Sequence, residues 1–141
     1  MKKEKIFLDT DVILDLLTER EPHFEPAVAL FLRIQNNTIE AYTSPVVFAN
    51  IFHILNKYFD KTKAIRSLIK LKSLVKVLDC GDRIIELALS SDFTDFEDSI
   101  QYYTALENSI EILITRNTKD YTTANIAIFT PVAYVNSLNA D

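Results

Sequence analysis

The sequence predicts one α/β domain over residues 1–141, built on a mostly parallel sheet of four to five strands flanked by helices. The first observation behind this prediction is the alternation of short apolar runs with longer stretches at helical spacing, an order typical of parallel-sheet domains. The second is the length, because a chain of about 150 residues suits one domain and buries roughly 68–70% of its unfolded surface. The chain also lacks internal repeats, low-complexity tracts and linkers.

The first half of the chain supplies three of the predicted strands. The apolar run IFL at 6–8 stops at Asp9, and a helical pattern starts at once. Ser44 followed by Pro45 marks a helix start, because serine caps helices and proline fits the first helical position. Asp60 can cap the helix that follows. The elements predicted after the first strand are helix 11–18, helix 25–36, strand 39–43, helix 45–58, helix 61–74 and strand 75–78.

The second half continues the alternation. The segment 79–81, DCG, turns the chain into another helix, and the run EILIT at 111–115 is the clearest buried strand after the first. Thr130 followed by Pro131 repeats the cap-and-proline start and opens a closing helix. The remaining predicted elements are helix 82–90, helix 95–108, polar loop 117–125 and strand 126–129.

Composition excludes several classes of protein. The one glycine, Gly81, leaves no glycine-rich phosphate loop or dinucleotide-binding fingerprint. The one cysteine, Cys80, allows no internal disulfide and suits a reducing cytoplasm. No run approaches the ~20 apolar residues of a membrane helix, and Asp9, Asp11 and Asp15 interrupt what would be the apolar core of a signal peptide. We therefore expect a cytoplasmic protein that does not contact a membrane.

The net charge of −5 argues against broad electrostatic binding of nucleic acid. It leaves open a substrate reached through a bound cation. A basic stripe of Lys63, Arg66 and Lys70, spaced i, i+3 and i+7, could steer RNA along one helix face. Such stripes are common on surface helices, so a solvated face is the favoured interpretation.

Acidic residues gather at three places. Asp9 ends the first strand, Asp120 lies in the loop after the strand EILIT, and a cluster of Asp92, Asp95, Glu97 and Asp98 precedes or opens a helix. Because the carboxyl ends of parallel strands meet at one edge of a sheet, Asp9 and the Asp120 loop are expected side by side. Asp98 could point into the same space from its helix start.

Carboxylates that lie close together repel one another, and this repulsion must be offset. Two unit charges ~4 Å apart repel by roughly 4 kcal/mol at an effective dielectric of 20, so the site must hold a cation or take up a proton. Oxygen ligands with water in the remaining positions favour Mg²⁺ or Mn²⁺. Such a site suits phosphodiester hydrolysis, since the ion activates water and neutralises phosphate charge.

Most of these acidic residues also have a structural explanation that involves no ligand. Helix capping and the helix dipole account for Asp92, Asp95 and Glu97 better than function does, whereas Asp98 is open between the two. Asp15 is expected to be an ordinary exposed helix residue. Asp9 is harder to explain structurally, because a carboxylate at the end of a buried strand needs partners. Asp9 is therefore the predicted centre of the site.

Taken in order, four segments resemble the PIN domain family, in particular its small bacterial VapC-like members. The segments are FLDTDVILDLL, TSPVVFANIFHIL, DFEDSIQYYTALE and ILITRNTKDY, and the resemblance spans nearly the whole chain. It implies a three-layer α/β sandwich, Mg²⁺ or Mn²⁺ in an acidic cleft, and endoribonuclease activity on single-stranded RNA. It also implies a homodimer and a toxin held inactive by a cognate antitoxin.

The resemblance assigns roles by position. Asp9 matches the first metal-ligand aspartate, Asp98 the aspartate of the third motif, and Asp120 the late acidic residue of the fourth. Asn117 lies just before Asp120, where Asp or Asn is found, and with Asn50 it could orient water or a ligand. Three further residues are secondary candidates: Asp11, Asp95 and Thr115, the last of which leads into the fourth motif together with Arg116.

The second motif departs from the family pattern at Asn50, where the family generally has glutamate. Asparagine offers a carbonyl oxygen but neither acts as a base nor cancels cation charge. One alternative is therefore a PIN-like module that binds RNA or a protein partner without cutting. Another is a phosphatase of the haloacid-dehalogenase type, with Asp9 as nucleophile and Asp11 as general acid. The sequence leaves open the RNA target, the number of metal ions and the existence of an antitoxin.

Overall fold

A single parallel sheet organises the structure, a computed structural model that describes residues 3–121 and 124–140. The strand order is β3-β2-β1-β4-β5, and all four strand pairs are parallel. Register places Phe7 of the central strand between Tyr42 and Leu113. The strands are β1 Glu4–Leu8, β2 Ile39–Thr43, β3 Val75–Val77, β4 Ile112–Ile114 and β5 Ala127–Phe129. The predicted parallel sheet is confirmed.

The helices begin and end close to their predicted limits. They are α1 Thr10–Leu17, α2 Phe24–Gln35, α3 Pro45–Tyr58, α4 Lys61–Lys72, α5 Asp82–Leu89, α6 Phe96–Glu107 and α7 Pro131–Leu138. The predicted polar loop 117–125 is wrong at one place, because Thr118–Tyr121 forms a 3-10 turn, η1; residues 122–123 of that loop lie outside the described residues. Within the described ranges, no helix has both the length and the apolar character needed to cross a membrane.

Predicted caps start several helices. The Ser44 hydroxyl accepts a hydrogen bond from the Val47 N–H at 3.2 Å, ahead of α3. The Thr130 hydroxyl does the same for the Ala133 N–H at 3.1 Å, ahead of α7. Both caps satisfy backbone donors that the first turn of a helix leaves free.

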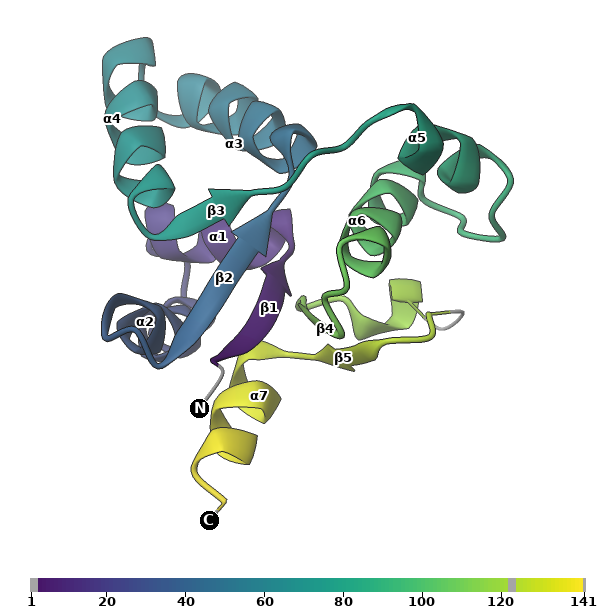
Figure 1. Cartoon of the computed structure of the whole chain (residues 1–141). Helices are drawn as coiled ribbons and strands as arrows, with labels where there is room; N and C mark the ends of the chain where they lie inside the picture. Colours follow the sequence, from purple (N-terminus) through teal and green to yellow (C-terminus); the bar gives the residue numbers. More distant parts are fainter. Residues whose placement is uncertain (1–2, 122–123, 141) are drawn as a thin grey trace.

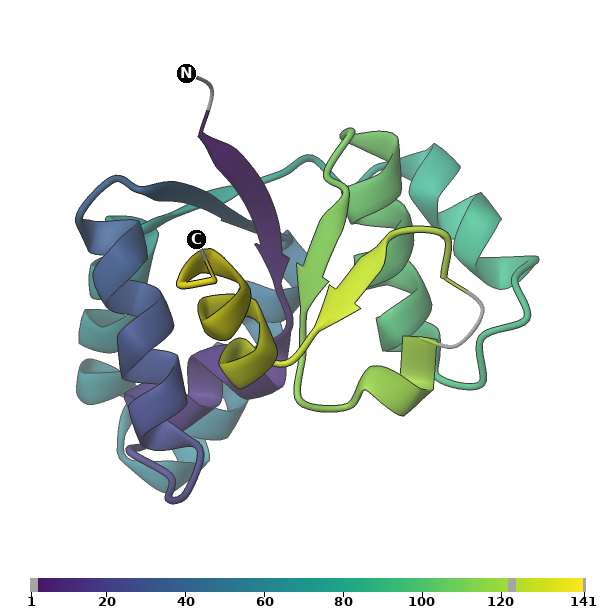
Figure 2. The ribbon, with the colours of Figure 1, turned by 90° about the horizontal axis from the view of Figure 1, so that it is seen from below.

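Helices cover both faces of the sheet, so the molecule has three layers (Figures 1 and 2). The side chains of β1 alternate between these two faces. Ile6 and Leu8 point to one face, where they pack into a core shared with α1, α2, α3, α4 and α7. Phe7 points to the other face and packs with residues of α6, and α5 packs on the outer side of α6. Because β1 is covered on both faces and paired with β2 and β4, Ile6, Phe7 and Leu8 are fully buried.

The expectation for Asp15 is wrong. Its side chain is only 1% exposed, and both of its oxygens accept hydrogen bonds from Arg116, Nε at 2.6 Å and Nη2 at 3.3 Å. The ion pair ties α1 to the segment that follows β4. Helical periodicity could not reveal a partner 101 positions away along the chain.

The two halves of this ion pair are expected to differ in their effect on stability. Arg116→Met should lower the free energy of unfolding by about 3 kcal/mol, because it leaves the buried Asp15 charge without a partner. Asp15→Asn should cost less, about 1 kcal/mol, since the Arg116 side chain is 25% exposed and water can hydrate it. Urea unfolding of both variants beside wild type measures the difference, and equal losses would contradict this account.

Candidate active site

Asp9 lies at the carboxyl end of β1 and caps α1, with 8% of its surface exposed. Three groups donate to its carboxylate: the Thr10 N–H at 2.8 Å, the Thr115 hydroxyl at 3.0 Å and the Tyr121 hydroxyl at 3.0 Å. Burial raises the pKa of Asp9 above its ordinary value, although these hydrogen bonds oppose the rise. The carboxylate that the sequence singled out is therefore buried, accepts several hydrogen bonds and lies at the carboxyl edge of the sheet.

Asp11 is the next carboxylate along α1 and shares a donor with Asp9. The Thr115 hydroxyl lies 3.3 Å from Asp11 Oδ2, and the Arg116 N–H donates to the same oxygen at 3.1 Å. Asp11 Oδ1 is buried and has no hydrogen-bond partner among the described residues. Burial, followed by the charge of Asp9, raises the pKa of Asp11 to about 6. An unpartnered buried oxygen in an acidic cluster calls for a cation or a proton.

Asp98 approaches Asp9 from the first turn of α6, across the hydroxyl of Tyr121. That hydroxyl lies 3.0 Å from Asp9 Oδ2 and 3.4 Å from Asp98 Oδ1. Burial raises the pKa of Asp98 to about 7, with further contributions from the charges of Asp9, Asp95 and Asp120. Sequence reasoning missed Tyr121, because it belongs to the segment predicted as polar loop; an aromatic residue in such a loop was the only available signal.

Five of the predicted site residues, Asp9, Asp11, Asp95, Asp98 and Asn117, line one shallow cavity of about 190 Å³. Its lining comprises Asp9, Thr10, Asp11, Leu14, Asp95, Glu97, Asp98, Gln101 and Asn117. Asp120 is outside this lining, yet its charge contributes to the raised pKa of Asp98. Asn50 is also outside it, and its amide donates to Glu97 Oε2 at 3.0 Å. The cavity thus joins residues from α1, α6 and the segment after β4.

Asp95 has the capping role expected for it. Its Oδ1 accepts the Asp98 N–H at 3.0 Å and so caps α6. Its side chain also lines the cavity, and its charge contributes to the raised pKa of Asp9. Capping and membership of the acidic cavity are therefore compatible in one residue.

The donor set suits a hard divalent cation, because it consists of carboxylate and amide oxygens. Among the described residues, no three acidic, histidine or cysteine side chains form a closed metal-ligand set, and the Tyr121 hydroxyl stands between Asp9 and Asp98. This is compatible with Mg²⁺, which usually binds through one or two carboxylates and keeps several water molecules. The unpartnered Asp11 oxygen and the raised carboxyl pKa values mark where positive charge is lacking.

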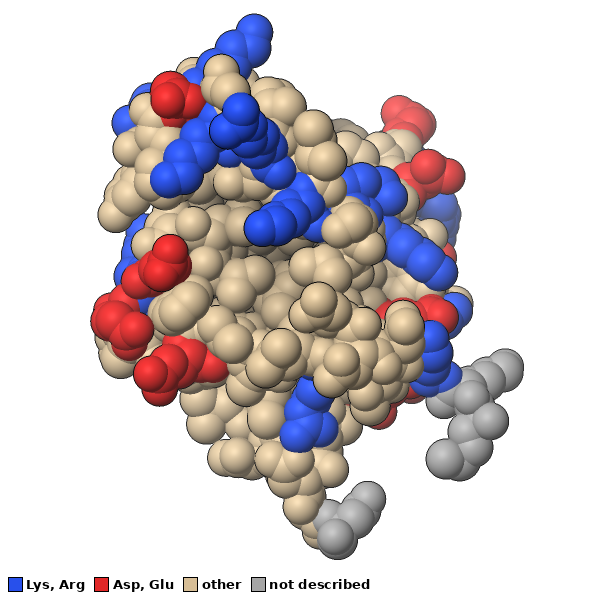
Figure 3. All heavy atoms as spheres, turned by 90° about the vertical axis from the view of Figure 1, so that its left-hand side faces the viewer, with Lys and Arg blue, Asp and Glu red and all other residues tan. Residues whose placement is uncertain are grey.

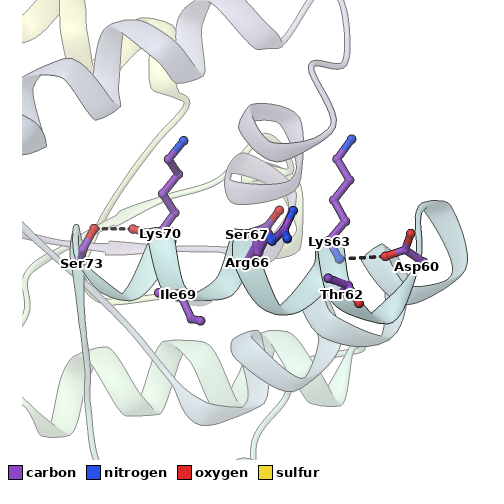
Figure 4. A pocket seen from close by; sticks show the side chains of 8 residues that line it. All are labelled: Asp60, Thr62, Lys63, Arg66, Ser67, Ile69, Lys70 and Ser73. Carbon is purple, nitrogen blue, oxygen red and sulfur yellow. Dashed lines mark hydrogen bonds between the residues drawn. The ribbon is translucent and has the colours of Figure 1, made fainter.

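The predicted basic stripe lies apart from this cavity, along α4. Lys63, Arg66 and Lys70 line a separate groove of about 740 Å³ that shares no lining residue with the acidic cavity. Figure 4 shows Lys63 and Lys70 extending to the same side of α4, with Arg66 between them. Figure 3 shows Lys and Arg side chains gathered on the part of the surface that carries α4. The three cations therefore line one groove, in a chain of net negative charge.

Comparison with known proteins agrees with the fold. Ribonuclease VapC1 of Aquifex aeolicus (strain VF5) is 24% identical over 144 residues, which cover 99% of this chain and 99% of that protein. VapC20 of Mycobacterium tuberculosis, a sarcin-ricin loop cleaving toxin, matches 86% of this chain and 96% of its own with a TM-score of 0.67 and 18% identity. A toxin-antitoxin complex from Klebsiella pneumoniae contains a chain with a TM-score of 0.67 and 22% identity, over 89% of this chain and 97% of its own.

A family model described as PIN domain matches residues 5–119, which contain every acidic residue of the cavity. The match covers most of the chain, and the parallel sheet and its flanking helices have the arrangement of the VapC structures. The chain therefore belongs to the PIN domain family.

Proposed function

We propose that this protein is a Mg²⁺- or Mn²⁺-dependent endoribonuclease that cleaves single-stranded RNA. The observation that carries the proposal is the pairing of the buried Asp9 carboxylate with Asp98 across the Tyr121 hydroxyl, in a cavity lined by acidic residues. The VapC1 relative is named as a ribonuclease, and the VapC20 structure is that of a toxin that cleaves the sarcin-ricin loop. Both are consistent with phosphodiester hydrolysis at this site.

The side chains have distinct roles in this proposal. Asp9 and Asp98 hold the cation, with Asp120 as the third predicted ligand beside Asp98. When bound, the cation neutralises charge on the phosphate and makes water a better nucleophile. Asn117 lines the cavity and offers an amide to orient water or substrate. Tyr121 and Thr115 hold the Asp9 carboxylate in place through their hydroxyl groups.

The biological setting belongs to the same proposal. A toxin restrained by a cognate antitoxin is supported by the Klebsiella pneumoniae toxin-antitoxin complex, which shares the fold. The expected homodimer and the cytoplasmic location remain predictions. Co-expression with the product of a neighbouring gene, followed by co-purification, would identify such an antitoxin.

Two alternatives make different predictions. In the binding-module alternative, the fold persists but the cavity does not support cleavage, because Asn50 cannot supply a carboxylate. In the phosphatase alternative, Asp9 would form a covalent phosphoryl intermediate with Asp11 as acid. The described contacts do not favour the latter, since the Thr10 N–H and the Tyr121 hydroxyl already donate to the Asp9 carboxylate and the Arg116 N–H donates to Asp11 Oδ2. The one proton of the Thr115 hydroxyl lies within reach of both carboxylates.

Asp98→Asn is expected to reduce cleavage of a mixed single-stranded RNA panel by about 100-fold or more, on the scale of the several kcal/mol that metal ions contribute. Wild type should cut only with Mg²⁺ or Mn²⁺ present. Asp92→Asn is the matched control, because Asp92 is an exposed acid near α6 that does not line the cavity. Absence of cutting by folded wild type under any metal would favour the binding module.

The raised carboxyl pKa values predict an unusual dependence of stability on pH. With folded pKa values of about 7 for Asp98 and about 6 for Asp11, the folded protein binds more protons than the unfolded chain between the ordinary value of 3.8 and these values. Stability contributed by these groups is therefore highest at low pH and falls as the pH rises through this window.

Thermal melting of the metal-free protein from pH 5 to pH 8 measures this effect. The melting temperature of wild type should fall more steeply over this range than that of Asp98→Asn, which lacks the titrating carboxyl. Added Mg²⁺ should raise the melting temperature of wild type more at pH 8 than at pH 5, because protons no longer compete for the carboxylates. If the melting temperatures of the two proteins fall equally with pH, the titration of Asp98 does not cause the loss of stability.

Removal of the basic stripe should weaken RNA binding without changing the chemistry. The triple change of Lys63, Arg66 and Lys70 to Ala is expected to raise KM. It should also make the slope of log binding constant against log salt concentration shallower, by the loss of up to about three phosphate contacts. The rate constant kcat should stay unchanged, since the α4 groove and the acidic cavity have separate linings. An unchanged KM and salt slope would identify the stripe as an ordinary solvated helix face.

A further inference from the structure

Asn50 and Glu97 form a contact that neither capping nor core packing requires. Asn50 lies on α3 and Glu97 in the first turn of α6, 47 positions apart, and the Asn50 Nδ2 donates to Glu97 Oε2 at 3.0 Å. Glu97 lines the acidic cavity together with Asp9 and Asp98. The contact thus connects the site residue that departs from the family pattern to a carboxylate already in the cavity.

Helix capping does not explain the position of the Glu97 side chain. The cap of α6 is Asp95, whose Oδ1 accepts the Asp98 N–H. The helix dipole favours an acid in the first turn, but it acts on charge and does not fix the direction of an exposed side chain. In the described part of the chain, the hydrogen bond that fixes the direction of Glu97 comes from Asn50.

The chemistry of this contact leaves the carboxylate available to a ligand. A neutral amide N–H orients one oxygen without cancelling the charge, whereas a guanidinium does both. Asp15 shows the contrast, because both of its oxygens accept from the positively charged Arg116. The Asn50 amide brings no opposing charge to Glu97, and Glu97 Oε1 has no part in the contact.

We infer that Glu97 is a carboxylate of the divalent-cation site and that Asn50 is the positioning residue that holds it there. Asn50 has no carboxylate of its own to offer, and through this contact the cavity gains one from α6 instead. The inference rests on the proposed function, since it concerns the same cation. In this inference Asn50 orients a metal ligand, Glu97, and its presence does not mean that the site has lost one.

Calorimetric titration of Mn²⁺ into the full-length protein, without RNA, tests the inference independently of catalysis. Glu97→Gln keeps the size of the side chain and removes its charge, and it should weaken Mn²⁺ binding by about ten-fold or more. Asp92→Asn removes the same charge from an exposed position outside the cavity and should leave Mn²⁺ affinity close to that of wild type. Because Glu97 is exposed, its variant is expected to fold, and circular dichroism checks this.

The role of Asn50 is tested by coupling and by rescue. Asn50→Ala should weaken Mn²⁺ binding in the wild-type background but have little further effect when Glu97 is already Gln, because the residue acts through Glu97. The double variant Asn50→Glu with Glu97→Gln moves the carboxylate across the contact and should recover most of the lost affinity. Equal effects of Asn50→Ala in both backgrounds would overturn the positioning role.

The outcomes separate this inference from the proposed function. If wild type binds Mn²⁺ and Glu97→Gln binds it equally well, the inference is wrong while the proposed nuclease stands. If wild type does not bind Mn²⁺, both are wrong. If Glu97→Gln weakens binding, Asp92→Asn does not, and the relocated carboxylate restores it, the assignment of Glu97 and Asn50 is supported.

Discussion

The burial of the Asp9 carboxylate at the end of the central strand is the constraint on which the rest of the site depends. Charge in a buried position is costly unless donors surround it. The adjacent Thr10 N–H supplies one donor, and two come from far along the chain, Thr115 after β4 and Tyr121 in η1. The parallel pairing of β1 with β4 brings two of these donors to Asp9. The same pairing fixes the edge at which the cavity opens.

Structural and chemical roles overlap in the acidic residues of the cavity. Asp9 caps α1 and Asp95 caps α6, so both carboxylates contribute to helix starts while adding negative charge to one cavity. Capping explains why each acid is tolerated locally. It does not explain why the acids share a cavity, where burial, followed by their mutual repulsion, raises the pKa of Asp98 to about 7. A cation relieves that repulsion, which links the electrostatics to the proposed function.

Asp15 and Glu97 show how the hydrogen-bond partner of a carboxylate determines whether its charge is neutralised or stays available to a ligand. Asp15 is buried and accepts two hydrogen bonds from the Arg116 guanidinium. Its charge is therefore neutralised in an ion pair that joins α1 to the segment after β4. Glu97 accepts from a neutral amide and remains exposed beside the cavity, so its charge stays available. The distinction is one of partner and burial, and residue type alone does not make it.

The sequence by itself determined the parallel α/β fold, the positions of the helices and strands, and the place of Asp9 at the end of a buried strand, because these follow from local patterns: apolar runs, caps and prolines. Only the tertiary structure decided that Asp15 is buried against Arg116, that Tyr121 stands between Asp9 and Asp98, and that Asn50 contacts Glu97. Each of these contacts joins residues at least 23 positions apart. Local periodicity carries no information about such pairs, since they form only when the folded sheet brings separate segments to the same edge.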